Sequence, residues 1–284
     1  MLANTKKMIL DAQKNGYAVP AFNVHDLVNI LACCDAAKEL RSPLILACTP
    51  ATFKFFGMSY IVGICEKMAK MHDIPIALHM DHHHEINQIK QGLDLGIKSI
   101  MIDASYYSLE KNIDTTKEVV ELCRKYDATV EAELGSVPGV EDDLDVKEAN
   151  VKKWLTPEIV RDFCKDTDVD TIAVAFGTAH GIYHETPKLN IELLKDIKKI
   201  CDTPLVMHGG SGLTKEQIRT CIAAGISKVN IGTELKAPYA NSLSQFFQQN
   251  PKENDPRKFF KPAIEAVKKV AKEKILICRS NNRY

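Results

Sequence analysis

Short apolar runs alternate with helical patterns eight times along this chain, and this alternation limits the possible folds more than any other feature. Each run is rich in aliphatic or β-branched residues and is followed by a segment of helical character. Continuous apolar runs of this kind are typical of parallel strands that are covered on both faces. The expected strands are residues 18–22, 44–47, 76–79, 99–102, 129–132, 171–175, 205–207 and 228–231.

Eight strand–helix units without a Ser/Pro-rich linker predict an α/β fold with a single (β/α)8 (TIM) barrel as its one domain, residues 1–284. The segments 26–40 and 109–126 have one apolar face, and a capping-box pattern at 214–217 opens a further helix. A doubly wound sheet is the alternative. It would normally carry a glycine-rich turn after its first strand, and residues 22–25 have none.

Two segments interrupt the alternation. Residues 135–155 form a long polar insertion after the fifth strand. Insertions after barrel strands lie on the catalytic face, so we expect this one to act as an active-site lid. The tail, residues 250–284, carries three prolines before an amphipathic helix that we expect from 263 to about 274. We expect this helical extension to serve packing or oligomer formation.

Charge and cysteine content exclude several classes of protein. The 284 residues contain 37 Lys and Arg and 37 Asp and Glu, so the chain lacks the basic surplus of a nucleic-acid binder, and a membrane-surface protein is disfavoured too. No apolar run approaches the ~18 residues of a membrane span. The nine cysteines are scattered without a CxxC pair, and no signal peptide is evident. We therefore expect free thiols and a cytoplasmic protein.

Three histidines follow separate predicted strands at the end where barrel active sites are built. His82 follows the third strand, His180 the sixth and His208 the seventh. Three imidazoles with a fourth coordination position open are what a catalytic zinc ion needs. Of the run 82–84, we expect at most one histidine to bind the metal.

Carboxylates occupy neighbouring strand ends. Asp81 precedes the histidine run, Asp103 ends the fourth strand and Glu133 ends the fifth. Asp103 and Glu133 could orient the imidazoles or bind an alternative metal position. Pairing with lysines is the other interpretation.

Two glycine-containing loops predict a phosphate site. Residues 208–212 and 230–233 each lead from a strand into a helix. Helix N-termini favour anions, and the loops after strands seven and eight are the usual phosphate site of this fold. Together with the histidines, they indicate zinc-assisted proton removal or C–C cleavage on a small phosphorylated molecule.

Seven blocks of sequence, in order, carry a resemblance to a known family. They are residues 16–23, 79–82, 101–105, 130–135, 177–181, 208–212 and 230–234. They resemble the blocks of the zinc-dependent class II ketose-bisphosphate aldolases, and the resemblance covers nearly the whole chain. It implies zinc held by His82, His180 and His208, with Asp103 and Glu133 at a second or alternative metal position.

The same resemblance implies the remaining roles. Asp81 would move the proton of the C4 hydroxyl, and Glu141, in the insertion, would shuttle the proton at C3. A monovalent cation, Na⁺ or K⁺, would lie near the phosphate. The implied substrate contacts are Asn23, Thr49, Gly181, Gly209, Gly210, Ser211, Asn230, Ile231, Gly232 and Thr233.

Within the family, His83 after His82 and the block 177–180 resemble the tagatose-1,6-bisphosphate branch. The implied reaction is the reversible cleavage of D-tagatose 1,6-bisphosphate to dihydroxyacetone phosphate and D-glyceraldehyde 3-phosphate, with fructose 1,6-bisphosphate as the alternative substrate. Pro138 and Ala51 depart from the family pattern and bear on loop dynamics and substrate preference. The resemblance also implies a homodimer or homotetramer and a possible companion aldolase subunit.

Two other classes of function are weighed against the aldolase. The His-x-His spacing at 82–84 also occurs in barrel metal-dependent hydrolases, although there it usually follows the first strand. A non-catalytic barrel subunit that supports a partner aldolase is the third class, and the intact histidine triad argues against it.

Overall fold

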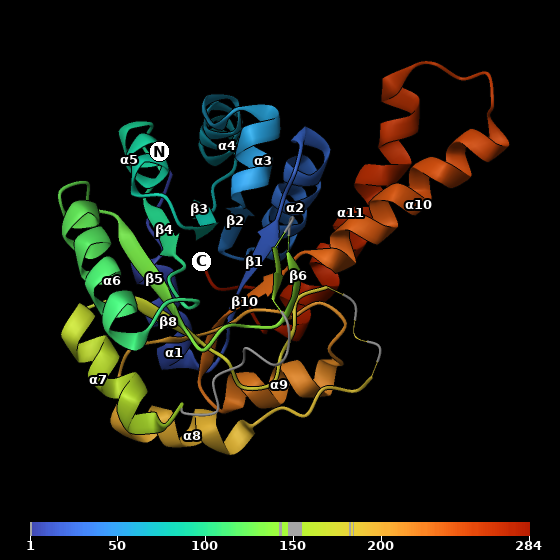
Figure 1. Cartoon of the computed structure of the whole chain (residues 1–284). Coiled ribbons are helices and arrows are strands. Elements are labelled where there is room, and N and C mark those ends of the chain that lie inside the picture. Colours follow the sequence, from blue (N-terminus) through green and yellow to red (C-terminus); the bar gives the residue numbers. More distant parts are fainter. Residues whose placement is uncertain (1, 142–143, 147–154, 182, 184) are drawn as a thin grey trace.

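Eight parallel strands close into a barrel, in the order β1-β10-β9-β8-β5-β4-β3-β2 (Figure 1). The computed structural model describes residues 2–141, 144–146, 155–181, 183 and 185–284, with only the backbone at 140, 141 and 144–146. The barrel strands are β1 (Val19–Asn23), β2 (Leu44–Cys48), β3 (Ile76–His83), β4 (Ser99–Ile102), β5 (Thr129–Leu134), β8 (Thr171–Val174), β9 (Leu205–Met207) and β10 (Ile226–Ile231). The predicted TIM barrel is confirmed. The doubly wound sheet is wrong, because β1 pairs with both β2 and β10 and leaves no open edge.

Helices cover the outside of the barrel. They are α2 (Leu27–Leu40), α3 (Pro50–Phe56), α4 (Met58–Met71), α5 (Ile86–Asp94), α6 (Leu109–Arg124), α7 (Pro157–Thr167), α8 (Ile191–Ile200) and α9 (Lys215–Ala223). The side chain of Asp26 caps α2 by accepting from the amide of Asn29, and Thr214 and Gln217 form the expected capping box of α9. Helices α2 and α9 therefore begin at polar residues whose side chains accept from otherwise free amides.

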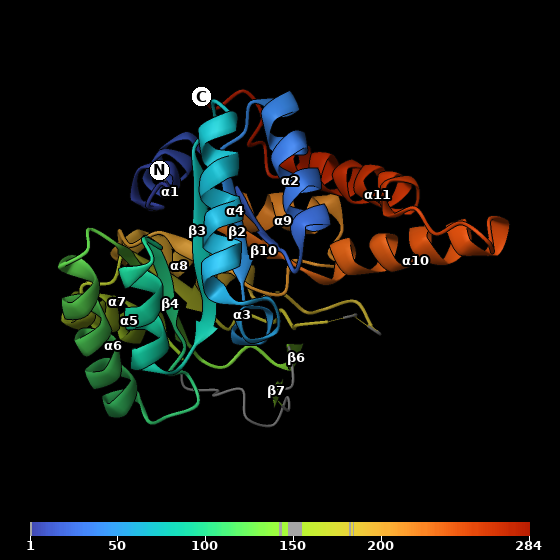
Figure 2. The same cartoon turned by 90° about the horizontal axis from the view of Figure 1, so that it is seen from above.

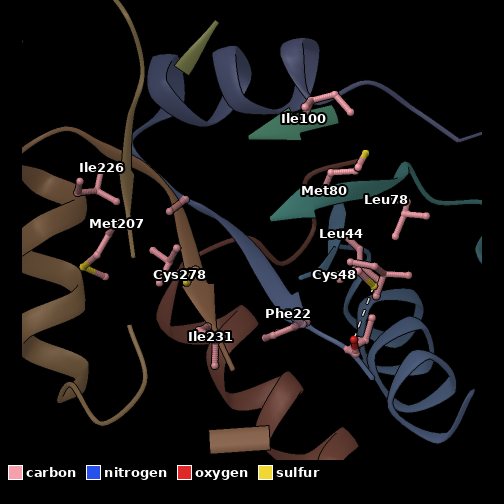
Figure 3. Packing of buried hydrophobic residues seen from close by; sticks show 14 of the residues in the cluster. Phe22, Leu44, Cys48, Leu78, Met80, Ile100, Met207, Ile226, Ile231 and Cys278 are labelled. Carbon is pink, nitrogen blue, oxygen red and sulfur yellow. Dashed lines mark hydrogen bonds between the residues drawn. The ribbon is translucent and has the colours of Figure 1, made fainter. Parts of the chain in front are cut away.

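Apolar side chains fill the layer between strands and helices. Figure 3 shows Phe22, Leu78, Met80 and Ile231 in this layer, together with thiol side chains such as Cys48. All nine cysteines are free and buried. They act as small apolar side chains in the core, as the sequence predicts.

Helix α1 (Lys6–Asn15) covers the amino end of the barrel. Its residues Met8, Ile9 and Ala12 are buried against Val19 and Ile45, which point into the barrel. Figure 2 shows α1 at the opposite end of the molecule from the β6–β7 hairpin. This helix and the apolar residues beneath it thus close the amino end of the barrel, which leaves the carboxyl end open for the site.

The tail differs from its predicted boundary. Helices α10 (Thr233–Gln249) and α11 (Pro256–Ile277) run side by side and extend away from the barrel as an arm (Figures 1 and 2). Helix α11 begins at Pro256, seven residues before the expected start, because proline suits the first helical position and Asp255 caps the amide of Arg257. Pro262 lies inside the helix, although a proline there has no amide hydrogen to donate.

Part of the predicted insertion forms a short hairpin. Strands β6 (Gly139–Glu141) and β7 (Leu144–Val146) pair antiparallel, and Gly139 bridges to His180. Residues 142–143 and 147–154 lie outside the described residues, as does the side chain of Glu141. The lid function stays a prediction. Within the described part of the chain, no helix has the length and apolar character needed to cross a membrane.

Candidate active site

A bulge in β3 brings two consecutive polar side chains to the carboxyl end of the barrel. The pairing with β4 shifts between Met80 and His83, and His82 has a φ of 49°, a left-handed conformation that is rare for a residue other than glycine. Successive side chains of a regular strand point to opposite faces. The bulge instead brings Asp81 and His82 together at the carboxyl end of the barrel. Such strain is found mostly where a side chain must be aimed for function.

The three predicted ligand histidines meet at this end. Ring centroids of His82 and His208 lie 4.7 Å apart, those of His82 and His180 5.1 Å, and those of His180 and His208 5.8 Å. One nitrogen from each ring lies within 4.8 Å of the others, as a single metal ion requires. His82 and His208 are buried and His180 is partly buried, so the cluster is open on one side.

The other two histidines of the run take different directions. His83 packs its ring against Phe53 and lies 3.0 Å from the carbonyl oxygen of Asp81. Burial lowers the pKa of His83 to about 4, so the ring is neutral at pH 7. His84 contacts the carbonyl oxygen of Asp103 at 2.8 Å. His82 alone of the three joins the cluster with His180 and His208.

Asp103 and Glu133 lie beside His82. Oδ2 of Asp103 is 2.8 Å from Nδ1 of His82, and the three side chains form a second group able to hold a metal ion. Burial would raise the pKa of Asp103, but hydrogen bonds from His82 and Ser105 outweigh it and hold the pKa below its usual value. Burial and the neighbouring charge of Asp103 raise the pKa of Glu133 well above normal. Asp103 therefore orients His82, and it also belongs to this second group of side chains that could hold a metal ion.

Asp81 is completely buried between two amide side chains. Asn23 Nδ2 donates to its Oδ2 at 2.8 Å, and Asn230 Nδ2 donates to its Oδ1 at 3.0 Å. Both amides come from predicted substrate residues. They hold the carboxylate in one orientation.

The two glycine loops interlock. Ser211 Oγ accepts from the amides of Gly232 (3.1 Å) and Glu234 (3.4 Å), and Oε1 of Glu234 accepts from the amide of Gly212 (2.9 Å). Lys274 of α11 forms an ion pair with Glu234. The arm helix α11 therefore anchors the loops that the sequence assigns to phosphate.

Tyr183 joins the loop after β8 to the first glycine loop. Its hydroxyl accepts from the amide of Ala179 and donates to the carbonyl of Gly209, both at 2.8 Å. Gly209 has a φ of +66°, and a Cβ there would lie 2.4 Å from the carbonyl oxygen of Ala179. The sequence reasoning missed Tyr183, which lies outside every motif.

A cavity unites most of the predicted substrate residues. It is lined by Asn23, His25, Thr49, His180, Gly181, Gly209, Ser211, Asn230, Gly232, Thr233 and Lys236. His25 and Lys236 are additions that the sequence reasoning did not contain. Two predicted contacts do not line it: Gly210 packs against the backbone of Asn230, and the side chain of Ile231 is buried in the outer core.

Three ionisable side chains missed from the sequence lie directly beneath the histidines. Glu131 Oε1 is 2.9 Å from Nε2 of His208, and Lys228 Nζ is 2.8 Å and 2.9 Å from the two oxygens of Glu131. His79 Nε2 lies 3.2 Å from the same Nζ. Burial would raise the pKa of Glu131, but the charge of Lys228 and the hydrogen bond from His208 lower it below normal. Burial, together with Lys228, lowers the pKa of His79 to about 3.

Comparisons with known proteins agree with this geometry. The family described as "Fructose-bisphosphate aldolase class-II" matches residues 3–283. The chain is 45% identical over 277 residues to the D-tagatose-1,6-bisphosphate aldolase subunit GatY of Klebsiella oxytoca, covering 98% of this chain and 97% of that one.

Solved structures share the fold. The YdjI aldolase of Escherichia coli K12 superimposes with a TM-score of 0.84 at 29% identity, covering 100% of this chain and 99% of that one. The fructose-bisphosphate aldolase of Campylobacter jejuni superimposes with a TM-score of 0.85 at 23% identity, covering 100% and 97%.

Proposed function

Because the chain belongs to the class II fructose-bisphosphate aldolase family, we propose that it catalyses the reversible aldol cleavage of D-tagatose 1,6-bisphosphate to dihydroxyacetone phosphate and D-glyceraldehyde 3-phosphate. The family makes the chain a lyase that breaks a C–C bond. The choice of the tagatose substrate is supported by the 45% identity to a tagatose-bisphosphate aldolase subunit over nearly the full length.

The residues present fit a zinc ion, which the family uses. His82, His180 and His208 supply three nitrogen donors from three separate strands, and carboxylates lie against the second ring nitrogens of His82 and His208. Three such donors with carboxylates behind them are the arrangement expected of a catalytic zinc site, which supports the proposal. When bound, zinc would supply a Lewis acid that stabilises negative charge on the substrate carbonyl oxygen. Asp103 and Glu133 would form the alternative metal position.

Asp81 is the proposed general base for cleavage. Its carboxylate is held by Asn23 and Asn230, which line the cavity, so it cannot rotate away from a substrate hydroxyl. In cleavage it would accept the proton of the C4 hydroxyl while the C3–C4 bond breaks, and in condensation it would return that proton to the aldehyde oxygen. Glu141, placed by its backbone in β6, is the proposed acid–base group at C3.

The glycine loops are the proposed site of one phosphate. The amides of Gly210, Gly212 and Gly232 already donate within the protein. This leaves the amides of Gly209 and Ser211, and Thr233 at the start of α10, as donors in the described loops. Backbone amides and a helix N-terminus can bind an anion without any surplus of basic residues. A monovalent cation, Na⁺ or K⁺, beside this phosphate is part of the proposal.

The substrate is tested by measuring kcat/KM of the zinc-loaded enzyme for both bisphosphates. We expect a higher value for tagatose 1,6-bisphosphate. The two sugars differ only in configuration at C4, so one or two contacts decide the preference. A large preference for fructose 1,6-bisphosphate would refute the tagatose assignment and leave the aldolase chemistry intact.

The reaction class is tested by metal removal. A chelator should abolish cleavage and added zinc should restore it, whereas borohydride with substrate should not inactivate the enzyme. Trapping of a lysine adduct by borohydride would replace the metal mechanism by a Schiff-base mechanism. Hydrolysis without triose products would indicate the metal-dependent hydrolase instead, although His84 lies outside the histidine cluster that a His-x-His site would need.

We further propose that residues 1–284 work as one domain in a homodimer or homotetramer in the cytoplasm. β1 and β10, from opposite ends of the chain, pair to close the barrel, which supports one domain. The projecting α10–α11 arm supports an oligomer, and light scattering of the purified protein tests it. The word "subunit" in the relative's name supports a companion chain. Full cleavage activity of the purified chain alone would refute the need for one.

A further inference from the structure

A chain of buried polar groups crosses the inside of the barrel beneath the histidine cluster, and apart from His208 its members take no part in the proposed reaction steps. All its side chains are at most 4% exposed. From the amino end to the active site it runs through Thr129, Thr5, Ser99, His79, Lys228, Glu131 and His208.

The hydrogen-bond direction in the upper half follows from the chemistry of Lys228 and Glu131. A lysine ammonium can only donate, and an ionised carboxylate can only accept. Lys228 donates to both oxygens of Glu131, at 2.9 Å and 2.8 Å. Glu131 Oε1, 2.9 Å from His208 Nε2, must therefore accept a proton carried by that nitrogen.

The lower half has one direction too. Lys228 Nζ lies 3.2 Å from Nε2 of His79, so that nitrogen accepts and the proton of the neutral ring is on Nδ1. His79 Nδ1 therefore donates to Ser99 Oγ at 2.8 Å. If the proton of His79 were on Nε2 instead, this N–H would face the ammonium group of Lys228, and two donors would be opposed.

Three hydroxyl groups complete the chain at the amino end. Thr129 donates to the carbonyl of Lys98 at 3.1 Å, so Thr5 donates to Thr129 at 2.7 Å and Ser99 donates to Thr5 at 3.1 Å. Each hydroxyl has one proton to give, and each is used once. These hydroxyl groups therefore fix the ring orientation of His79, whereas the direction of the hydrogen bond at Glu131 is set by Lys228 itself.

We propose that Glu131, clamped by Lys228, is a positioning residue that holds the proton of His208 on Nε2 and presents Nδ1 to the metal position. Nδ1 is the atom that lies 3.0 Å from Nε2 of His82, inside the cluster. Asp103 does the opposite for His82, since it contacts Nδ1 and leaves Nε2 facing the cluster. Asp103 thus presents Nε2 of His82 to the metal position, and Glu131 presents Nδ1 of His208 to the same position. This inference rests on the proposed zinc centre.

Stability alone does not explain why a charged pair lies here. Glu131 is 3% exposed and Lys228 is fully buried. Removing two charges from water is costly, and replacing a buried ion pair by apolar residues of similar volume is often neutral or stabilising. A hydrogen bond that orients a metal-binding imidazole commonly accounts for 10–100-fold in metal affinity. We therefore attribute the buried ion pair of Glu131 and Lys228 to the positioning of His208.

The wild-type protein provides the first test. In zinc-loaded protein labelled with ¹⁵N-histidine, NMR should show the ring proton of His208 on Nε2 and that of His82 on Nδ1. A His208 ring proton on Nδ1 would overturn the proposal without any variant being made. The measurement uses no substrate, so an inactive enzyme with the expected protons would refute the proposed function and leave this inference standing.

Two variants provide the second test, with zinc affinity measured by chelator competition. Glu131→Asp keeps a charge beside Lys228 but shortens the side chain by one bond, about 1.5 Å. Glu131→Leu with Lys228→Met removes both charges and is designed to keep the fold. We expect zinc to bind 10–100-fold more weakly in both.

Ser99→Ala is the matched control, because Ser99 is buried in the same interior and contacts His79 but neither Glu131 nor His208. We expect its zinc affinity to stay within about twofold of wild type, with the His208 ring proton unchanged. Wild-type zinc affinity in both Glu131 variants would overturn the proposal. An equal loss in Ser99→Ala would overturn it too, because the effect would then come from general damage to the barrel.

Discussion

Replacing Asp81 by asparagine tests the proposed proton transfer directly, because the change removes the base and keeps the shape of the side chain. Asp81 is fully buried and accepts one amide hydrogen each from Asn23 and Asn230. An asparagine at this position has a single carbonyl oxygen. One of the two neighbouring amides must then turn over or lose its partner.

The structure separates the catalytic and structural costs of Asp81→Asn. One lost or rearranged hydrogen bond lowers the free energy of unfolding by about 1 kcal/mol. Loss of the general base lowers kcat by about 100- to 10,000-fold, which corresponds to about 3–5 kcal/mol in the activation barrier. Asp81 is not among the clustered nitrogens of His82, His180 and His208. Zinc content should therefore remain at the wild-type level.

Three measurements check this: kcat at saturating bisphosphate, zinc content by mass spectrometry, and the free energy of unfolding in urea. Asp170→Asn is the control, because Asp170 also accepts a hydrogen bond, from the amide of Val130, but it is only partly buried and lies at the amino end of the barrel. We expect it to lose similar stability and no activity. A zinc-loaded Asp81→Asn enzyme with kcat within threefold of wild type would show that Asp81 is not the base.

Three further predictions concern the loops and the histidine run. Lys274→Met removes the ion pair that holds Glu234 against the glycine loops, so steady-state kinetics should show KM for the bisphosphate several-fold higher with kcat little changed; an unchanged KM would contradict this. Gly209→Ala places an alanine in a left-handed backbone conformation and its Cβ against the carbonyl of Ala179. Urea unfolding should show that the free energy of unfolding falls by about 1–3 kcal/mol. Wild-type stability would show that the loop can move aside. Burial lowers the pKa of His83 to about 4, whereas the unfolded chain takes up this proton below pH 6.5. The contribution of neutral His83 to the free energy of unfolding is complete above pH 6.5 and is lost as the pH falls toward 4. Between pH 7 and 4.5, the free energy of unfolding of the zinc-free wild type should therefore fall by about 2.5 kcal/mol more than that of His83→Asn. Equal losses would contradict the lowered pKa of His83.

The barrel was predictable because its signals are local. A strand such as β2 is apolar at every position, since one face meets helices and the other meets the barrel interior. The ends of such strands meet at one end of the barrel, so the polar residues there could be grouped without knowing any distance. The histidine cluster could be predicted for this reason, because His82 lies at the end of β3, His208 directly follows β9 and His180 lies in the loop after β8.

The bulge at His82 could not be predicted in the same way. A left-handed residue in a strand is usually announced by glycine or asparagine, and here it is a histidine. Regular alternation from His79 would have pointed Asp81 inward and His82 outward. The inward position of both is a property of the pairing between β3 and β4, which needs the three-dimensional register.

The charged interior had a signal in the sequence that was left unused. Thr129, Glu131 and Glu133 alternate with Val130 and Ala132 along β5, the pattern of a strand with one polar face. An apolar-run criterion overlooks that pattern. The partner of Glu131 was beyond reach, since Lys228 is 97 residues away and its place opposite Glu131 depends on how the closed barrel is filled.

Glu131 and Glu133 show how that interior divides chemical roles between identical side chains. They are two residues apart on the same face of β5, and both are almost fully buried. Lys228 and His208 lower the pKa of Glu131, which therefore stays ionised and can accept a hydrogen bond at every working pH. Among the described residues, none of the charges that act on Glu133 is a lysine, and burial together with the charge of Asp103 raises its pKa. Environments that shift the pKa values of two neighbouring carboxyl groups in opposite directions give the two groups different chemical roles. Glu131 is therefore suited to accept a hydrogen bond from His208 as a carboxylate, whereas Glu133 takes up a proton more readily.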